Sequence, residues 1–432
     1  MRSATLLLCV SIGLASRAQA ATLTVGPPGS GAQFDQIQSA VDAAQPGDVI
    51  LVQPGSYAKV TVDKPLRILG DGSGPVVIGA SLANGVVVED IAAGQELVLS
   101  GVEVQATPAG LPEPASVLVR DCAGTVVLHD LLVDFPGSQV GVQVEDCARA
   151  VLLACRVLDG GAVDVVPTTG AVTVRDSELW LADSELVGLS PAFFSVAPGN
   201  HGLRLSGSTA RVWRSTLRGG DASNGKPGLD FGVGGAGVHA SDSVLTLYGG
   251  PVGELQGGDG VQTGLFGFNF PGGAGVDLLD GSSARVQQDI PIAGGVDGAG
   301  AAQAPGVQVD GGSSFQLEPA VFPTLASDVQ QVATGGLITM TLAGNAGGIQ
   351  LLFLSFGSGP TISIPGVEGQ TFLDPLQFLL LTTTVLPAGQ IGVPLPVPAS
   401  SALLGQTLFL QAAESFGAGI AISNPDLVTV TL

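Results

Sequence analysis

The segments VLVRDC (Val117–Cys122) and VQVEDC (Val142–Cys147) decide the fold of this chain, because they repeat one short strand and turn 25 residues apart. Seven copies are recognisable, beginning at Val117, Val142, Val172, Leu203, Val238, Val276 and Val307. A second apolar strand follows most copies, centred on Leu128, Leu153, Leu181, Val212, Leu247 and Val286. Glycine pairs such as Gly219-Gly220 close several units. Each repeat is therefore predicted to be strand, tight turn, strand and glycine-rich loop.

Repeats of this kind predict a solenoid whose coils pair in parallel and bury ladders of Val, Leu and Ile. A propeller blade needs four strands per repeat, and a leucine-rich repeat carries a conserved Asn or Cys; neither pattern occurs. The 65 glycines and the 12% of charged residues agree with a chain rich in turns and poor in long helices.

The stretch FDQIQSAVDAAQPGDVILVQPGSY (34–57) precedes the repeats and predicts a cap. Apolar residues share one helical face from Phe34 to Ala44, and Pro46-Gly47 ends that helix. A short apolar strand, Val49–Val52, follows directly. We expect the helix to cover the open edge of the first coil.

With its downstream coils, this stretch resembles the right-handed parallel β-helix proteins of the pectin-lyase-like superfamily, over about residues 22–320. The resemblance implies an all-β fold, a right-handed parallel β-helix with an N-terminal helical cap. The superfamily includes lyases, hydrolases, esterases, epimerases, adhesins and non-catalytic surface proteins. The resemblance therefore implies no single function.

The two ends of the chain differ from its centre. Residues 1–20 combine Arg2, the apolar run Leu6–Leu14 and a small-residue cleavage site, which predicts a secretory signal peptide and a secreted or cell-surface protein. No later apolar stretch reaches the roughly 18 residues of a membrane span. We expect a β-helix domain over residues 21–325, with the cap at 22–60 and the coils at 60–320.

The last hundred residues predict a separate, small antiparallel β-sandwich over 326–432. From Gln331 onward there is no Lys or Arg, and short strands alternate with Gly, Pro and Ser turns. This region resembles C-terminal modules of secreted bacterial repeat proteins. We expect an independent domain, and its role is left open between covering the last coil and joining a partner or cell-surface layer.

The charge of the chain argues against nucleic acid as a partner. Without Arg2 and Arg17 of the predicted signal peptide, 13 Lys and Arg stand against 37 Asp and Glu, a net charge of −24. Such a surface repels phosphate backbones and anionic lipid. Solubility and collective binding of divalent cations such as Ca²⁺ both account for the acidity. No other cofactor is expected.

Histidines and strand-end aspartates offer little catalytic signal. Polygalacturonase-like enzymes carry Gly-His-Gly and Arg-Ile-Lys, whereas the nearest string is Asn200-His201-Gly202 and only three lysines occur. We expect His201 to open a strand, and His129 and His239 to face solvent from theirs. The aspartates at equivalent turns are expected to form a structural column that includes Asp121, Asp146 and Asp176.

The glycine-rich loops between residues 219 and 306 are the candidate ligand surface. They carry the three candidate ligand-binding residues, Asp221, Asp230 and Asp259, beside the aromatic residues Phe231, Phe266, Phe268 and Phe270. Acids beside exposed aromatics are typical of sugar sites, while flexible glycine filler with self-packing Phe residues is the alternative.

Two function classes follow. The first is a non-catalytic, secreted or cell-surface β-helix scaffold that binds polysaccharide or a surface partner. The second is a polysaccharide lyase or glycoside hydrolase with a divergent carboxylate site. We favour the first, because no basic residue stands beside an acid cluster on outward strand positions, and the catalytic residues of the second stay unknown. The net charge predicts binding of neutral sugars, or of acidic ones through Ca²⁺, and no cleavage of acidic glycans.

Three cysteines remain after the predicted signal peptide: Cys122, Cys147 and Cys155. Cys122 and Cys147 hold equivalent places on adjacent coils, about 5 Å apart, which is within reach of a disulfide. Stacked side chains point in parallel, so buried reduced thiols are the alternative. The sequence leaves this pair of alternatives open.

Overall fold

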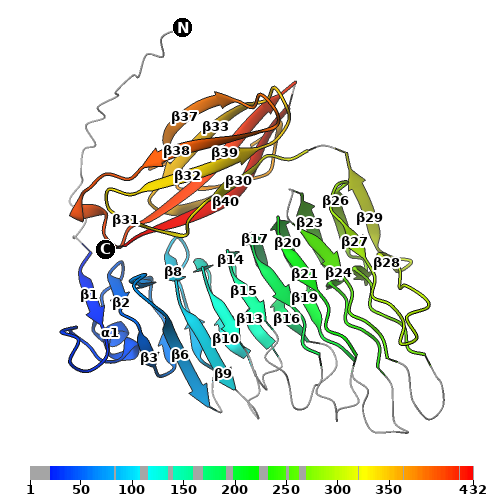
Figure 1. Cartoon of the computed structure of the whole chain (residues 1–432), viewed down its shortest axis with the longest axis horizontal. Coiled ribbons are helices and arrows are strands. Elements are labelled where there is room, and N and C mark those ends of the chain that lie inside the picture. Colours follow the sequence, from blue (N-terminus) through cyan, green and yellow to red (C-terminus); the bar gives the residue numbers. More distant parts are fainter. Residues whose placement is uncertain are drawn as a thin grey trace.

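The computed structural model of the chain describes residues 20–81, 84–107, 115–134, 140–158, 169–190, 198–222, 232–249, 253–261, 269–319, 321–362, 364–417 and 419–431. Its first three-quarters form a parallel β-helix built from three parallel sheets of 11, 9 and 9 strands, here called A, B and C. Figure 1 shows the coils stacked side by side from the blue N-terminal end to the yellow-green end. The predicted parallel β-helix is confirmed.

Each central coil places one strand in each sheet, in the order C, A, B. Sheet A holds β1 (Thr22–Val25), β2 (Val49–Val52), β5 (Arg67–Gly70), β8 (Glu96–Ser100), β11 (Thr125–His129), β14 (Arg149–Leu153), β17 (Glu178–Ala182), β20 (Thr209–Trp213), β23 (Val244–Tyr248), β26 (Ser283–Gln287) and β29 (Ser314–Glu318). Sheet C holds β4 (Val60–Val62), β7 (Val86–Glu89), β10 (Ala115–Arg120), β13 (Val140–Glu145), β16 (Gly170–Arg175), β19 (His201–Ser206), β22 (Val238–Ser241), β25 (Val276–Leu279) and β28 (Val307–Val309). Sheet B holds β3 (Gly55–Tyr57), β6 (Val76–Ser81), β9 (Glu103–Thr107), β12 (Leu132–Asp134), β15 (Arg156–Leu158), β18 (Glu185–Val187), β21 (Thr216–Arg218), β24 (Glu254–Gln256) and β27 (Ile292–Ala293).

The register agrees with the sequence repeat in most coils. Val119 pairs in parallel with Val144, as the repeat predicts. In sheet A, Leu128 pairs with Leu152, so Leu153, which was predicted to be equivalent to Leu128, is one residue out of register. The sequence also predicted two strands per coil, whereas the coil has three. Many sheet B strands contain only three residues, too few to show a period-2 pattern.

Left-handed aspartates turn the chain from sheet C to sheet A. Successive coils place a residue with φ between 47° and 59° at this bend: Asp90, Asp121, Asp146, Asp176, Gly207, Asp242 and Asp280. Asp tolerates this region better than most residues because its short side chain bonds locally. The predicted column of turn aspartates is confirmed.

A ladder of hydroxyl and thiol groups lines the inside of the same bend. The backbone N–H of Cys147 donates to Ser177 Oγ at 2.8 Å, and the N–H of Ser177 donates to Ser208 Oγ at 3.3 Å. Cys122, Cys147 and Cys155 are all free and buried, and the first two donate their thiols to backbone carbonyls two residues earlier. Of the two alternatives for the cysteines, the structure therefore has reduced, core-packed thiols.

The N-terminal helix α1 (Ile37–Ala43) closes one end of the stack. It buries Ile37, Ala40 and Val41 in the core of the first coils. The helix is shorter than predicted, because Phe34 forms a bridge with Val25 instead of a helical turn.

The C-terminal module, residues 324–431, is a two-layered β structure. One sheet contains β30 (Thr324–Ser327), β32 (Leu337–Ala343) and β38 (Gln390–Pro396), and the other contains β31 (Gln331–Ala333), β40 (Gly419–Thr431), β39 (Thr407–Phe416), β33 (Ile349–Ser355) and β37 (Leu379–Val385). Smaller elements are β34 (Ser358–Ile362), β35 (Val367–Glu368), β36 (Thr371–Leu373) and the 3-10 helix η1 (Ser401–Leu403). Most pairs are antiparallel, but β31 and β35 pair with β40 in parallel.

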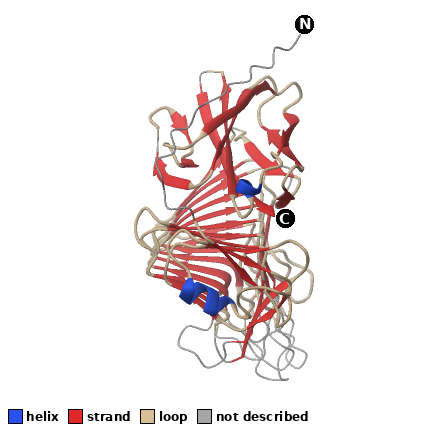
Figure 2. Cartoon of the chain, turned by 90° about the vertical axis from the view of Figure 1, so that its left-hand side faces the viewer, coloured by secondary structure: helices blue, strands red, loops and turns tan. Residues whose placement is uncertain are grey.

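The C-terminal module lies along the outer face of sheet A rather than over the last coil. Figures 1 and 2 show it on one side of the stacked strands. Trp180, Trp213 and Tyr248 of sheet A form one apolar cluster with Phe372 and Phe409 of the module and with Phe322, which precedes the module. The module also has an apolar core of its own, which includes Leu325, Met340 and Leu410, so the independence of this domain stays a prediction.

His129 lies in this interface and is fully buried, so the expectation that it faces solvent is wrong. Its Nε2 donates to Gln330 Oε1 of the module, and Ser100 Oγ donates to its Nδ1, both at 2.8 Å. Burial lowers the pKa of His129 to about 4. The neutral ring is thus part of the docking contact.

We expect acid to weaken the protein through His129. Because the folded-state pKa is lowered from 6.5, the contribution of the neutral ring is complete above pH 6.5 and is lost as the pH falls to about 4. The loss amounts to about 3 kcal/mol. Urea unfolding at pH 7 and pH 4 should therefore show a larger drop for the wild type than for His129→Gln. Equal drops in both proteins would contradict this role.

Candidate ligand-binding groove

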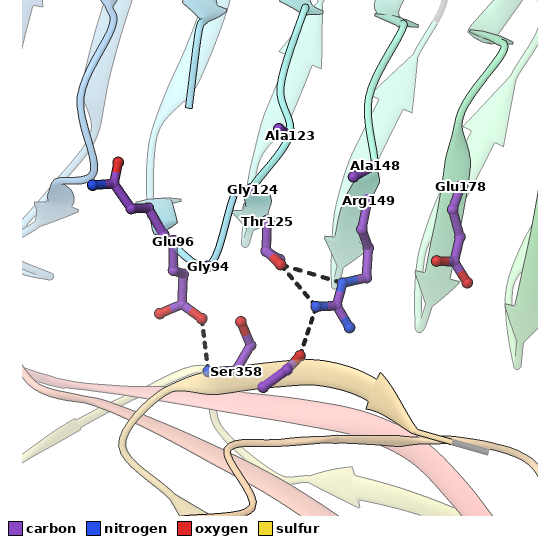
Figure 3. A pocket seen from close by; sticks show the side chains of 11 residues that line it. Gly94, Glu96, Ala123, Gly124, Thr125, Ala148, Arg149, Glu178 and Ser358 are labelled. Atoms are coloured by element: carbon purple, nitrogen blue, oxygen red, sulfur yellow. Dashed lines mark hydrogen bonds between the residues drawn. The ribbon is translucent and has the colours of Figure 1, made fainter. Parts of the chain in front are cut away.

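A first cavity, of about 370 Å³, lies between sheet A and the C-terminal module. Figure 3 shows its polar wall, where Glu96, Thr125, Arg149 and Glu178 stand on four successive coils. Arg149 donates to Thr125 Oγ1 at 2.9 Å and to the carbonyl of Gly359 at 2.6 Å, and Glu96 accepts the N–H of Ser358 at 2.7 Å. Glu178 pairs with Arg211. The contacts of Arg149 with Gly359 and of Glu96 with Ser358 join the β-helix to the module, so we interpret the cavity as part of the docking interface.

The glycine-rich loops form a second feature, a backbone layer between sheets B and C. We call Gly199, Gly220, Gly235, Gly258, Gly273 and Gly295 the glycine layer. Within it, the N–H of Gly235 donates to the carbonyl of Gly220, and the N–H of Gly258 donates to that of Gly235, both at 2.8 Å. The series continues from Gly273 to Gly258 at 2.8 Å. The loops are thus joined coil to coil as strands are.

Only glycine fits in this layer. A Cβ on Gly235 would lie 2.0 Å from the carbonyl oxygen of Asn200, and one on Gly258 would lie 2.0 Å from that of Gly220. The interpretation of these glycines as flexible filler is therefore wrong for the described part of the loops. They are glycines because the backbones of successive coils approach each other directly.

Two of the three predicted ligand-binding acids lie on these loops and are joined by a hydrogen bond. Asp221 Oδ1 accepts the N–H of Asp259 at 2.8 Å, and Asp259 Oδ1 accepts the N–H of Val296 at 2.9 Å. Both residues are exposed. Asp230 lies outside the described residues, as do Phe231, Phe266 and Phe268. Asp221 and Asp259 form a hydrogen-bonded ladder that ties the loops together.

A groove of about 640 Å³ runs beside the glycine layer. One wall is backbone, from Gly199, Gly234 and Gly273 among others. The other wall carries polar side chains from four successive sheet C strands: His201 of β19, His239 of β22, Asp277 of β25 and Gln308 of β28. Since neighbouring coils are about 4.8 Å apart, the groove presents a polar group at each step along the stack.

The two histidines stand side by side at one end of this series of polar groups. Their rings stack with centroids 4.4 Å apart and planes 7° from parallel. His239 Nδ1 donates to Asp277 Oδ2 at 2.9 Å, while His201 Nδ1 accepts the N–H of Ala236 at 3.0 Å. His201 is the first residue of β19, as expected of a residue that opens a strand. His239 is partly covered, with 17% of its side chain exposed, rather than facing solvent freely.

The electrostatics of the groove keep His201 neutral. Burial lowers the pKa of His201 well below its ordinary value, and the neighbouring His239 and Arg204 lower it further. Asp277 uses Oδ2 for His239, while its Oδ1 is buried without a hydrogen-bond partner in the structure. A buried carboxylate oxygen without a donor is costly.

The described residues show neither a metal-binding cluster nor a membrane-spanning helix. This part of the chain holds no group of three or more His, Cys, Asp or Glu placed to bind a metal ion, so Ca²⁺ remains a prediction. None of its helices is both long and apolar enough to cross a membrane.

Sequence reasoning named His201 and His239 but gave them structural roles, and it did not name Asp277 or Gln308. The alternation of inward and outward residues could have found them. Arg204 and His239 each follow an inward residue, so they hold the same outward position in neighbouring strands. Asp277 and Gln308 continue that row. His201 could not be placed with them by counting, because it lies at the strand end.

Comparisons with known proteins show no family for this chain. No protein family profile and no curated protein matches it. The crystal structure of Spo0M, a sporulation control protein from Bacillus subtilis, matches 26% of this chain and 50% of that one, at 10% identity and a TM-score of 0.16. A likeness this weak carries no argument about fold or function.

Proposed function

We propose that this protein is an exported, non-catalytic β-helix scaffold that binds a neutral polysaccharide in the groove beside the glycine layer. The observation that supports the proposal is the groove itself, in which four successive coils line up polar side chains beside the glycine-rich loops. A linear glycan presents hydroxyl groups at regular intervals, which suits a row of hydrogen-bonding groups on a rigid repeat.

The charges of the groove favour a neutral ligand. Asp277 and Asp297 both line it, and the whole chain has a net charge of −22. Backbone N–H groups, first that of Ala301, lower the pKa of Asp297, so this carboxylate stays charged. Because like charges repel, an acidic glycan is disfavoured here.

A glycan array tests this proposal. We expect the wild-type protein to bind neutral glycans, and His239→Ala to lose about tenfold or more in affinity, because it removes a hydrogen-bonding group and part of the groove wall. Ser206→Ala is the matched control, since Ser206 ends β19 outside the groove. The control should bind like the wild type.

Two results would overturn the proposal. One is a wild-type protein that binds no glycan, or that binds with an affinity which His239→Ala leaves unchanged. The other is release of new reducing ends from a glycan, which would favour the alternative of a polysaccharide lyase or glycoside hydrolase.

A further inference from the structure

The stacked histidines of the groove have opposite hydrogen-bonding roles at Nδ1. The carboxylate oxygen of Asp277 only accepts, so His239 Nδ1 carries a proton. The backbone N–H of Ala236 only donates, so His201 Nδ1 carries none. In the neutral rings, Nε2 of His239 is therefore a bare acceptor and Nε2 of His201 is a donor.

We infer that His201 and His239 together recognise neighbouring hydroxyl groups of a neutral sugar, one as a donor to the ligand and the other as an acceptor from it. This inference rests on the proposed function and specifies the ligand groups that the groove would recognise. A hydroxyl group both donates and accepts, so two adjacent hydroxyls can satisfy both nitrogens at once. The parallel stacking, with centroids 4.4 Å apart, places these two rings within the span of one sugar unit.

The surrounding residues favour a different tautomer in each of the two rings. Asp277 Oδ2 lies 2.9 Å from His239 Nδ1 and fixes the proton there. Arg204, the register neighbour of His239 in β19, disfavours a positive charge on His201. Asp297 is the other charged group that lines the groove. A site that reads hydroxyls through buried polar groups rejects ligands that lack them, because its own groups are then left unpaired.

The first arm of the test reads the tautomers without any ligand. The chain has three histidines, so long-range ¹H–¹⁵N NMR of histidine-labelled protein at pH 7.5 resolves them, with His129→Gln, His201→Phe and His239→Phe for assignment. We expect the Nδ1–H tautomer for His239 and the Nε2–H tautomer for His201. The same tautomer in both rings would overturn the inference.

The second arm measures binding of cellohexaose, mannohexaose and xylohexaose, each beside its O-methylated form. We expect at least one hexasaccharide to bind, its methylated form to bind about tenfold or more weakly, and His201→Phe and His239→Phe each to lose about tenfold. Phe preserves an aromatic ring for stacking. Binding that both Phe variants and methylation leave unchanged overturns the inference but leaves the proposed function standing. No binding to any hexasaccharide or array glycan overturns both.

Discussion

Replacing Gly258 with alanine should cost about 3–5 kcal/mol of unfolding free energy, a large effect for one methyl group. The Cβ of the new residue would lie 2.0 Å from the carbonyl oxygen of Gly220 and 2.4 Å from its carbonyl carbon. Both atoms are backbone, so no side chain can rotate away. The coils have to separate, which breaks the hydrogen bonds that Gly258 makes to Gly235 and Gly273. Urea denaturation followed by circular dichroism measures the loss.

Gly311→Ala is the matched control for this prediction. Gly311 also lies in the β-helix, but an added Cβ there meets no atom within 4 Å. Its unfolding free energy should stay within about 0.5 kcal/mol of the wild type. Similar values for both variants would show that the glycine layer is not closely packed.

The second large effect is expected at the docking interface, from Trp180→Ala. Trp180 is 1% exposed, and its ring lies 5.5 Å from the rings of both Trp213 and Phe372. It also lies beneath the guanidinium of Arg149 at 5.9 Å. Truncation removes the central contact between the β-helix and the C-terminal module and leaves a cavity. We therefore expect the unfolding free energy to fall by about 3–5 kcal/mol.

Urea unfolding tests this second prediction, with Leu317→Ala as the control. Leu317 is an apolar residue of the same sheet but is 52% exposed, on the last coil. Its truncation should cost less than about 1 kcal/mol. An unfolding curve of Trp180→Ala that overlays the wild type would mean that the aromatic cluster does not hold the two parts together.

Much of the coil could be predicted from the sequence, because its determinants are local. Val119 and Val144 lie one repeat apart, and period-2 burial then sets their pairing. The turn aspartates, such as Asp121 and Asp146, follow from the same local chemistry. The short strands of sheet B, by contrast, have no sequence pattern that sets their register. Their pairing follows from the strands that precede and follow them in each coil.

The docking and the groove depend on which residues meet across coils. Trp180, Trp213 and Tyr248 each stand next to a predicted inward residue of sheet A, and so point outward on successive coils. Outward aromatic residues on three successive coils indicate a covering partner, but nothing in the sequence says that residues 324–431 supply it. Likewise, Gly220 and Gly258 approach each other closely because two loops are in contact. A glycine-rich composition is the same for closely packed loops and for flexible loops, so it could not predict this contact.

The most direct test of the central claim is a crystal structure of the protein with the neutral glycan that binds best on the array. The account predicts sugar density in the groove, with ligand hydroxyls within hydrogen-bond distance of Nε2 of His239 and His201. Sugar density elsewhere, on sheet B or on the C-terminal module, with the groove filled only by water, would contradict it.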